Sequence, residues 1–130
     1  MSSVGLVREW SATTPDTIRS VRRAVADYAH RLGVAGEKLD AVVLAVSEAA
    51  TNVVVHAYPD HIGPLHLSAM VSGGELCVRI VDDGVGCNAG SRNPGLGLGL
   101  GLIADSCDHF TLVQRRPRGT TATLRFQLAD

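Results

Sequence analysis

Three polar residues recur at four-residue intervals in the most apolar segment of the chain. Glu48, Asn52 and His56 belong to residues 39–58, LDAVVLAVSEAATNVVVHAY, whose composition predicts one long helix. Because residues four apart share one side of a helix, the three side chains are expected to form a single stripe. A carboxylate and an amide in such surroundings cost free energy unless they are satisfied. The stripe is therefore a solvated or internally hydrogen-bonded surface, or one wall of a binding site.

A short acidic and glycine-containing segment follows an apolar run at the expected end of a strand. It reads Val81-Asp82-Asp83-Gly84-Val85-Gly86. Asp82 can accept a hydrogen bond from an exocyclic amino group, and Gly84 and Gly86 allow the backbone to approach a flat purine ring. A simple Asp-Asp-Gly turn is the structural alternative.

A glycine-rich run farther along opens a predicted helix. In Gly97-Leu98-Gly99-Leu100, the N–H groups of Gly97 and Gly99 could bind phosphate at the positive end of that helix. Alternation of glycine with leucine leaves several registers open, and a flexible, close-packing glycine run is the alternative. No Lys-Ser or Lys-Thr follows, and the sixth position of a G-x-G-x-x-G pattern is leucine. The run also follows a loop, which argues against a Rossmann turn.

Length and composition favour one globular domain, residues 1–130, with a real hydrophobic core. A formal charge of −1 gives no reason to expect direct binding of nucleic acid or of an anionic membrane. The basic run at Arg115, Arg116 and Arg118 is interpreted as a solvated hairpin. Three cysteines without C-x-x-C spacing favour a reducing compartment. With no signal-peptide pattern and no apolar run expected to span a membrane, we expect a soluble cytoplasmic protein.

The elements that must position these residues follow from periodicity and turn signals. Thr14 and Pro15 begin a helix that Gly33 ends, and Pro59 stops the central helix. Strands are expected at 4–10, 65–71, 76–80, 110–115 and 120–128, a third helix at 98–107, and a lid-like loop at 87–94. This order predicts an α+β fold, an α/β sandwich with helices on one face of a mixed, largely antiparallel sheet.

In this order, the central helix and the two glycine segments resemble the N, G1 and G2 boxes of the GHKL (Bergerat-fold) ATPase superfamily. The helix sequence SEAATNVVVHAY is most similar to the anti-sigma-factor serine/threonine kinases within it. The resemblance extends from residues 20–23 to residues 119–126. It implies the histidine-kinase-like ATPase fold that the pattern of elements also predicts.

The resemblance implies roles for residues at the three boxes. Asp82 would contact the adenine amine of ATP, and Asn52 would bind Mg²⁺, for which its neutral oxygen is suited. Glu48 would orient or deprotonate an attacking hydroxyl, with a purely structural carboxylate as the alternative. His56 is expected to pack or to support its neighbours.

The resemblance also selects a register for the glycine run. Leu102-Ile103 and Asp108 match the family's L-I-x-x-x-x-D, so that Gly97, Gly99 and Leu100 are the expected nucleotide contacts. Thr120 would support the phosphate loop, and Arg92 would reach phosphate from the lid.

The implied function is an anti-sigma factor with protein serine kinase activity. Its substrate would be a STAS-type anti-anti-sigma protein, its second partner a sigma factor, and its expected state a homodimer. A non-catalytic ATP-binding module that switches partners is the alternative. The ATPase half of a sensor histidine kinase fits poorly, because no helix with a phosphoacceptor histidine precedes the ATPase region.

Overall fold

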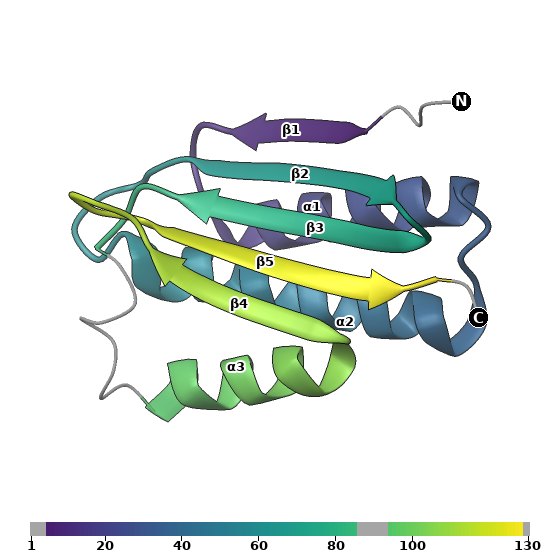
Figure 1. Ribbon diagram of the computed structural model, residues 1–130. Coiled ribbons are helices and arrows are strands. Elements are labelled where there is room, and N and C mark those ends of the chain that lie inside the picture. Colours follow the sequence, from purple (N-terminus) through teal and green to yellow (C-terminus); the bar gives the residue numbers. More distant parts are fainter. Residues whose placement is uncertain (1–4, 86–93, 129–130) are drawn as a thin grey trace.

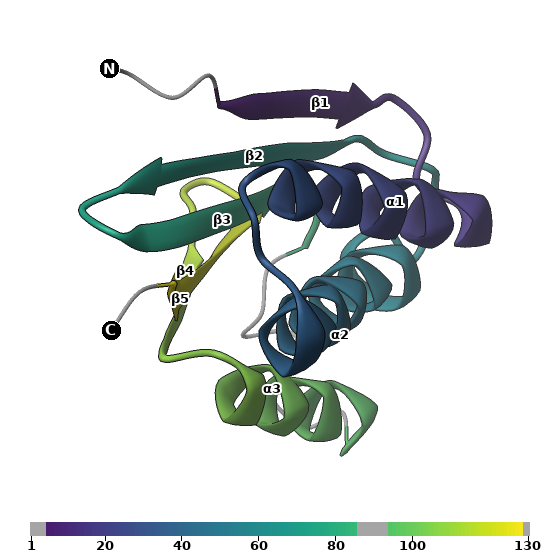
Figure 2. The same cartoon turned by 90° about the vertical axis from the view of Figure 1, so that its right-hand side faces the viewer.

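One antiparallel sheet and a layer of three helices on one of its faces make up the fold. The computed structural model describes residues 5–85 and 94–128. Figures 1 and 2 show the helices side by side on one face of the sheet, with α2 between α1 and α3. The elements are β1 (Leu6–Trp10), α1 (Pro15–Arg31), α2 (Gly36–Asn52), η1 (Val53–Ala57), β2 (Leu65–Ser72), β3 (Glu75–Asp82), α3 (Pro94–Ser106), β4 (His109–Gln114) and β5 (Thr120–Gln127).

The strand order is β1-β2-β3-β5-β4, and all four neighbouring pairs are antiparallel. The sequence had left room for a parallel pair in a mixed sheet, and the described strands form none. The reason is topological. The connection through α3 brings the chain back as β4 at the edge, and the turn at 115–119 then returns β5 to the interior beside β3.

Both ends of α1 follow the local signals in the sequence. Thr14 is the extended N-cap residue, its N–H donates to the Thr17 hydroxyl at 2.9 Å, and Pro15 is the first helical residue. At the other end, Gly33 has a φ of +89°. The N–H of Val34 donates to the carbonyl of Ala29 at 3.0 Å, which adds a backbone hydrogen bond across the end of the helix.

The central helix differs from its prediction at both ends. It begins at Gly36, before the predicted Leu39, and its last turn is the π-helical η1, so that His56 follows Asn52 through a wider turn than an α-helix has. Gly36–Ala57 is also 22 residues long and contains an 18-residue window with a mean hydropathy of 1.4, enough by length and composition to cross a membrane. The expectation that no segment has this character was therefore wrong, although the core helix of a folded domain can share it.

The core lies between the sheet and the helices, as the alternation along the strands predicts. Leu65, Leu67 and Ala69 of β2 are buried, while Gly73 and Gly74, both at positive φ, form the turn into β3. Ala122, Leu124 and Phe126 of β5 point inward as expected, and Leu128, just past the strand, is only half-buried.

Candidate functional site

A cavity separates the second half of the central helix from the sheet. The volume of this cavity is about 50 Å³. Five elements contribute side chains to it: the α2–η1 helix, β3, α3, β4 and β5. The lining residues are Ala49, Asn52, Val53, His56, Ala57, Ile80, Asp82, Leu100, Ile103, Phe110, Leu112, Thr120 and Ala122. Most of these are apolar, so a bound molecule would be surrounded by apolar side chains and would find few polar groups to contact.

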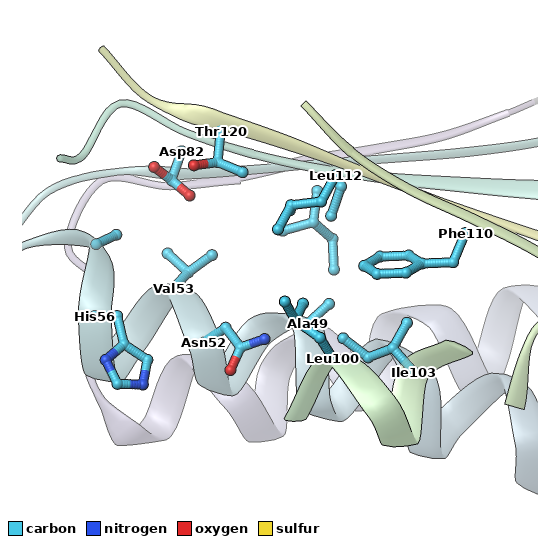
Figure 3. A pocket seen from close by; sticks show the side chains of 13 residues that line it. Ala49, Asn52, Val53, His56, Asp82, Leu100, Ile103, Phe110, Leu112 and Thr120 are labelled. Carbon is cyan, nitrogen blue, oxygen red and sulfur yellow. The ribbon is translucent and has the colours of Figure 1, made fainter. Parts of the chain in front are cut away.

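On the helix side, the predicted polar stripe is only partly at the cavity. Asn52 and His56 line it, and Figure 3 shows both on the lower wall, below Val53. Glu48 is half-buried one turn earlier and is not part of the lining. Among the described residues, Glu48 makes no hydrogen bond or ion pair. Nothing in the described part of the chain therefore fixes its carboxylate in one orientation.

On the sheet side, Asp82 and Thr120 lie next to each other because they are register partners on β3 and β5. Figure 3 shows both side chains on the wall opposite Asn52. The sequence resemblance had assigned Thr120 to the phosphate loop. The structure places it beside Asp82 on the sheet wall of the cavity, and its role at the phosphate loop stays a prediction.

Asp82 is a buried carboxylate, 5% exposed, that faces an apolar cavity. Its Oδ1 accepts a hydrogen bond from the N–H of Gly84 at 2.9 Å, the closure of a short turn. Burial raises the pKa of Asp82, and the backbone N–H groups of Gly84 and Thr120 oppose that rise. Burial separates this carboxylate from water. An amino group that enters the cavity would donate a hydrogen bond to it in place of the lost water.

Gly84 is required by close packing against the end of the helix. A Cβ at this position would lie 2.1 Å from the carbonyl oxygen of Ala57, and that same carbonyl accepts a hydrogen bond from the N–H of Val85 at 2.9 Å. The turn after Asp82 is therefore attached directly to η1. This explains why a glycine follows the aspartates. From the sequence, Gly84 had been expected to let the backbone approach a purine ring.

The glycine run lies differently from its prediction. Helix α3 begins at Pro94, so Gly97 and Gly99 are inside it and not before its first turn. The N–H groups left free at the start of a helix belong to its first turn, which makes Gly97 and especially Gly99 poorly placed to donate to phosphate in this conformation. Leu100 lines the cavity, together with Ile103 from the next turn, and its contact with nucleotide stays a prediction. Gly86 and Arg92 lie outside the described residues.

Two residues that the sequence did not single out support the turn. Arg115 Nη1 donates to the carbonyl oxygen of Asp82 at 2.9 Å and pairs with Asp83 Oδ1 at 2.6 Å. The Tyr58 hydroxyl accepts a hydrogen bond from the N–H of Asp83 at 2.8 Å. Arg115 had been interpreted as part of a solvated hairpin. Its sequence signal was its position at the end of the strand predicted at 110–115.

The polar groups present suit ATP better than a metal held by protein alone. Within residues 5–85 and 94–128, no three His, Cys, Asp or Glu side chains gather as a metal site. Mg²⁺ usually takes few protein ligands and keeps phosphate or water oxygens. The Asn52 amide at the cavity is thus a sufficient protein ligand only when a polyphosphate supplies the others.

A family of histidine kinase-like ATPase domains matches residues 11–126. The chain belongs to this family. It is 27% identical over 119 residues to an anti-sigma F factor of Clostridium acetobutylicum, with 83% of each chain covered. It is 32% identical over 68 residues to the serine-protein kinase RsbW of Bacillus mycoides, which is 52% of this chain and 42% of that protein. The chain thus spans less than half of RsbW.

Two solved structures share the fold. One contains the RsbU and RsbW domains of a Mycobacterium tuberculosis protein, with a TM-score of 0.77 and 21% identity over 98% of this chain and 33% of that one. The other is the SiaB–SiaC complex of Pseudomonas aeruginosa, with a TM-score of 0.65 and 16% identity over 92% and 88% of the two chains. At these identities the likeness establishes the α+β architecture alone.

Proposed function

We propose that this protein is an ATP-dependent serine kinase that also acts as an anti-sigma factor. It phosphorylates a STAS-type anti-anti-sigma protein and, in its other state, sequesters a sigma factor. The observation that carries the proposal is the buried Asp82 carboxylate across an apolar cavity from Asn52. The relatives named anti-sigma F factor and serine-protein kinase RsbW support the choice of partners. We place the protein in the cytoplasm, where sigma factors act, as a homodimer.

In the proposed mechanism, Asp82 reads the base and Asn52 orients the phosphates. The Asp82 carboxylate accepts a hydrogen bond from the adenine amine while the apolar lining covers the ring. Mg²⁺ held by Asn52 and the phosphates would neutralise charge that develops during transfer. Glu48, one turn before Asn52, takes the proton of the substrate serine. The serine Oγ–phosphorus bond forms as the bond from the γ-phosphorus to the bridging oxygen breaks, and ADP leaves.

Transfer of label tests the kinase. The purified chain is incubated with Mg²⁺, γ-³²P-labelled ATP and the STAS-domain proteins of its own organism. We expect one of them to be labelled on serine, and Glu48→Gln to reduce the rate by about 10²–10⁴-fold while ATP binding persists. Labelling of none of them by wild type, or undiminished labelling by Glu48→Gln, would contradict the proposal.

A second candidate function is an ATP-binding module that switches partners without phosphorylation. It is favoured by the position of Glu48, which does not line the cavity and has no partner among the described residues. Under this alternative, ATP changes which partner the protein captures. Mass spectrometry of the captured STAS protein would then find no phosphoserine.

A further inference from the structure

The turn that presents Asp82 to the cavity is held by residues from two other parts of the chain. On one side, the Arg115 guanidinium reaches the carbonyl oxygen of Asp82 at 2.9 Å and the carboxylate of Asp83 at 2.6 Å. On the other, the Tyr58 hydroxyl accepts the N–H of Asp83 at 2.8 Å. The main chain at Asp82 and Asp83 is thus fixed between the β4–β5 hairpin and the end of the helix.

The geometry of the β4–β5 hairpin places the Arg115 guanidinium next to the turn at Asp82 and Asp83. The N–H of Arg115 donates to the carbonyl of Gly119 at 2.8 Å, which closes the turn. Gly119 has a φ of +103°, and a Cβ there would lie 2.4 Å from the carbonyl oxygen of Asp82. A non-glycine residue would therefore be strained and would also push the hairpin away from β3.

Polar contacts continue from the turn to β2 and β1 of the sheet. Asp83 Oδ2 lies 3.5 Å from Nε2 of His66, and Nδ1 of the same ring lies 3.3 Å from Glu9. The Arg115 guanidinium, followed by the His66 contact, holds the pKa of Asp83 below its usual range. The pair between Asp83 and Arg115 is consequently intact at neutral pH.

We propose that Arg115 is a positioning residue for nucleotide binding, which acts by fixing the Asp82–Asp83–Gly84 turn so that the Asp82 carboxylate faces the base. It touches the main chain of Asp82 and not the cavity, whose lining does not include it. The inference rests on the proposed function, because it assumes that the cavity binds adenine nucleotide.

Two simpler roles for Arg115 predict different results. If the Arg115–Asp83 ion pair only stabilised the fold, it would add little to the free energy of unfolding, since both side chains are over 40% exposed. Its loss would then lower the melting temperature without changing the affinity for nucleotide. A purely electrostatic attraction for phosphate would make Asp83→Asn bind nucleotide more tightly, because that change removes a negative charge. Under the positioning role, Asp83→Asn weakens binding, because it removes the group that orients the guanidinium.

The experiment measures dissociation constants for Mg·ATP and for uncharged adenosine by calorimetry, and melting temperatures without ligand. For Arg115→Ala we expect both ligands to bind about tenfold more weakly, the loss expected for one hydrogen bond. Asp83→Asn should weaken both in the same direction. Arg118→Ala removes the same charge from the same hairpin, contacts neither aspartate, and is the matched control that should leave adenosine binding unchanged.

The outcomes of this experiment distinguish a failure of the inference about Arg115 from a failure of the proposed function. If wild type binds neither ligand, the proposed function fails and the inference with it. If wild type binds but Arg115→Ala binds adenosine equally well, only the inference is overturned. Tighter binding of Mg·ATP by Asp83→Asn, or an equal loss of adenosine binding in Arg118→Ala, also overturns it.

Discussion

At the scale of single residues, Asp82 is an ionisable group held in a buried position at the cavity. It is 5% exposed, its side chain accepts only backbone N–H groups, and burial raises its pKa. A buried carboxylate of this kind costs stability whenever it is ionised. Its presence at the cavity is typical of a group kept for binding at the expense of the empty protein's stability.

Replacing Asp82 with asparagine is expected to stabilise the ligand-free protein at pH 7. The folded pKa of Asp82 lies above its unfolded value, so its contribution is favourable at low pH and is lost as pH rises through the folded pKa. Asparagine keeps the oxygen that Gly84 contacts and never ionises. Urea unfolding should therefore show a higher free energy of unfolding for Asp82→Asn than for wild type at pH 7. This difference should shrink as the pH is lowered through the pKa of Asp82. An asparagine variant less stable than wild type at pH 7 would contradict this account.

The sequence identified some of these residues and missed others for a physical reason. Asp82 and Asn52 have residue types and neighbours that suggest chemistry by themselves. Arg115 is separated from Asp82 by 33 positions, and its role exists only because β5 pairs with β3 and brings the hairpin to that point. No local pattern could predict such a contact, and an arginine in a polar turn is most often solvated.

At the scale of elements, the site depends on how the turn after β3 meets the end of the helix. Gly84 and Val85 pack on the carbonyl group of Ala57, so the sheet wall and the helix wall of the cavity are joined there. Widening of the helix into η1 occurs in the same turn. A change at this junction would move both walls at once.

A side chain at Gly84 should disturb this junction. In Gly84→Ala the new Cβ would lie 2.1 Å from the Ala57 carbonyl oxygen, and we expect a loss of about 1–3 kcal/mol in the free energy of unfolding, with weaker nucleotide binding. Gly101→Ala is the control, since nothing lies within 4 Å of its Cβ and alanine favours helix by about 1 kcal/mol. Equal stability of the two variants in chemical denaturation would argue against a tight junction.

The starts and ends of elements were predicted well where capping signals exist. Thr14, Pro15 and Gly33 bound α1 as expected, and the Gly73-Gly74 turn fixes the hairpin. The start of α3 was missed because leucine and glycine alternate from Gly95 to Gly101, a period of two that hides a helix. The π-helical end of the central helix has no sequence signal that distinguishes it from an α-helical turn.

At the scale of the whole molecule, the cavity draws on five elements from both layers, so a ligand bound there links them. Such a ligand stabilises the folded state by an amount that depends on its concentration relative to its dissociation constant. At one hundred times the dissociation constant the gain is about 2.7 kcal/mol.

Mg·ATP is therefore expected to raise the melting temperature by on the order of 5–10 °C under these conditions. Asn52→Ala should remove most of the part that depends on Mg²⁺, because the amide is the polar oxygen that the helix offers to the cavity. Thermal unfolding with ATP, with and without EDTA, measures both parts. An unchanged Mg²⁺-dependent shift in Asn52→Ala would exclude Asn52 as a ligand.

The interior position of β5 has a consequence for how the protein is made. This strand comes last in the sequence but lies between β3 and β4, and its Leu124 and Phe126 complete the core under α2. During synthesis, the part of the sheet-facing surface of α2 that Leu124 and Phe126 cover is therefore exposed until the ribosome has released Thr120–Gln127. Apolar surface exposed through that interval favours aggregation of the nascent chain.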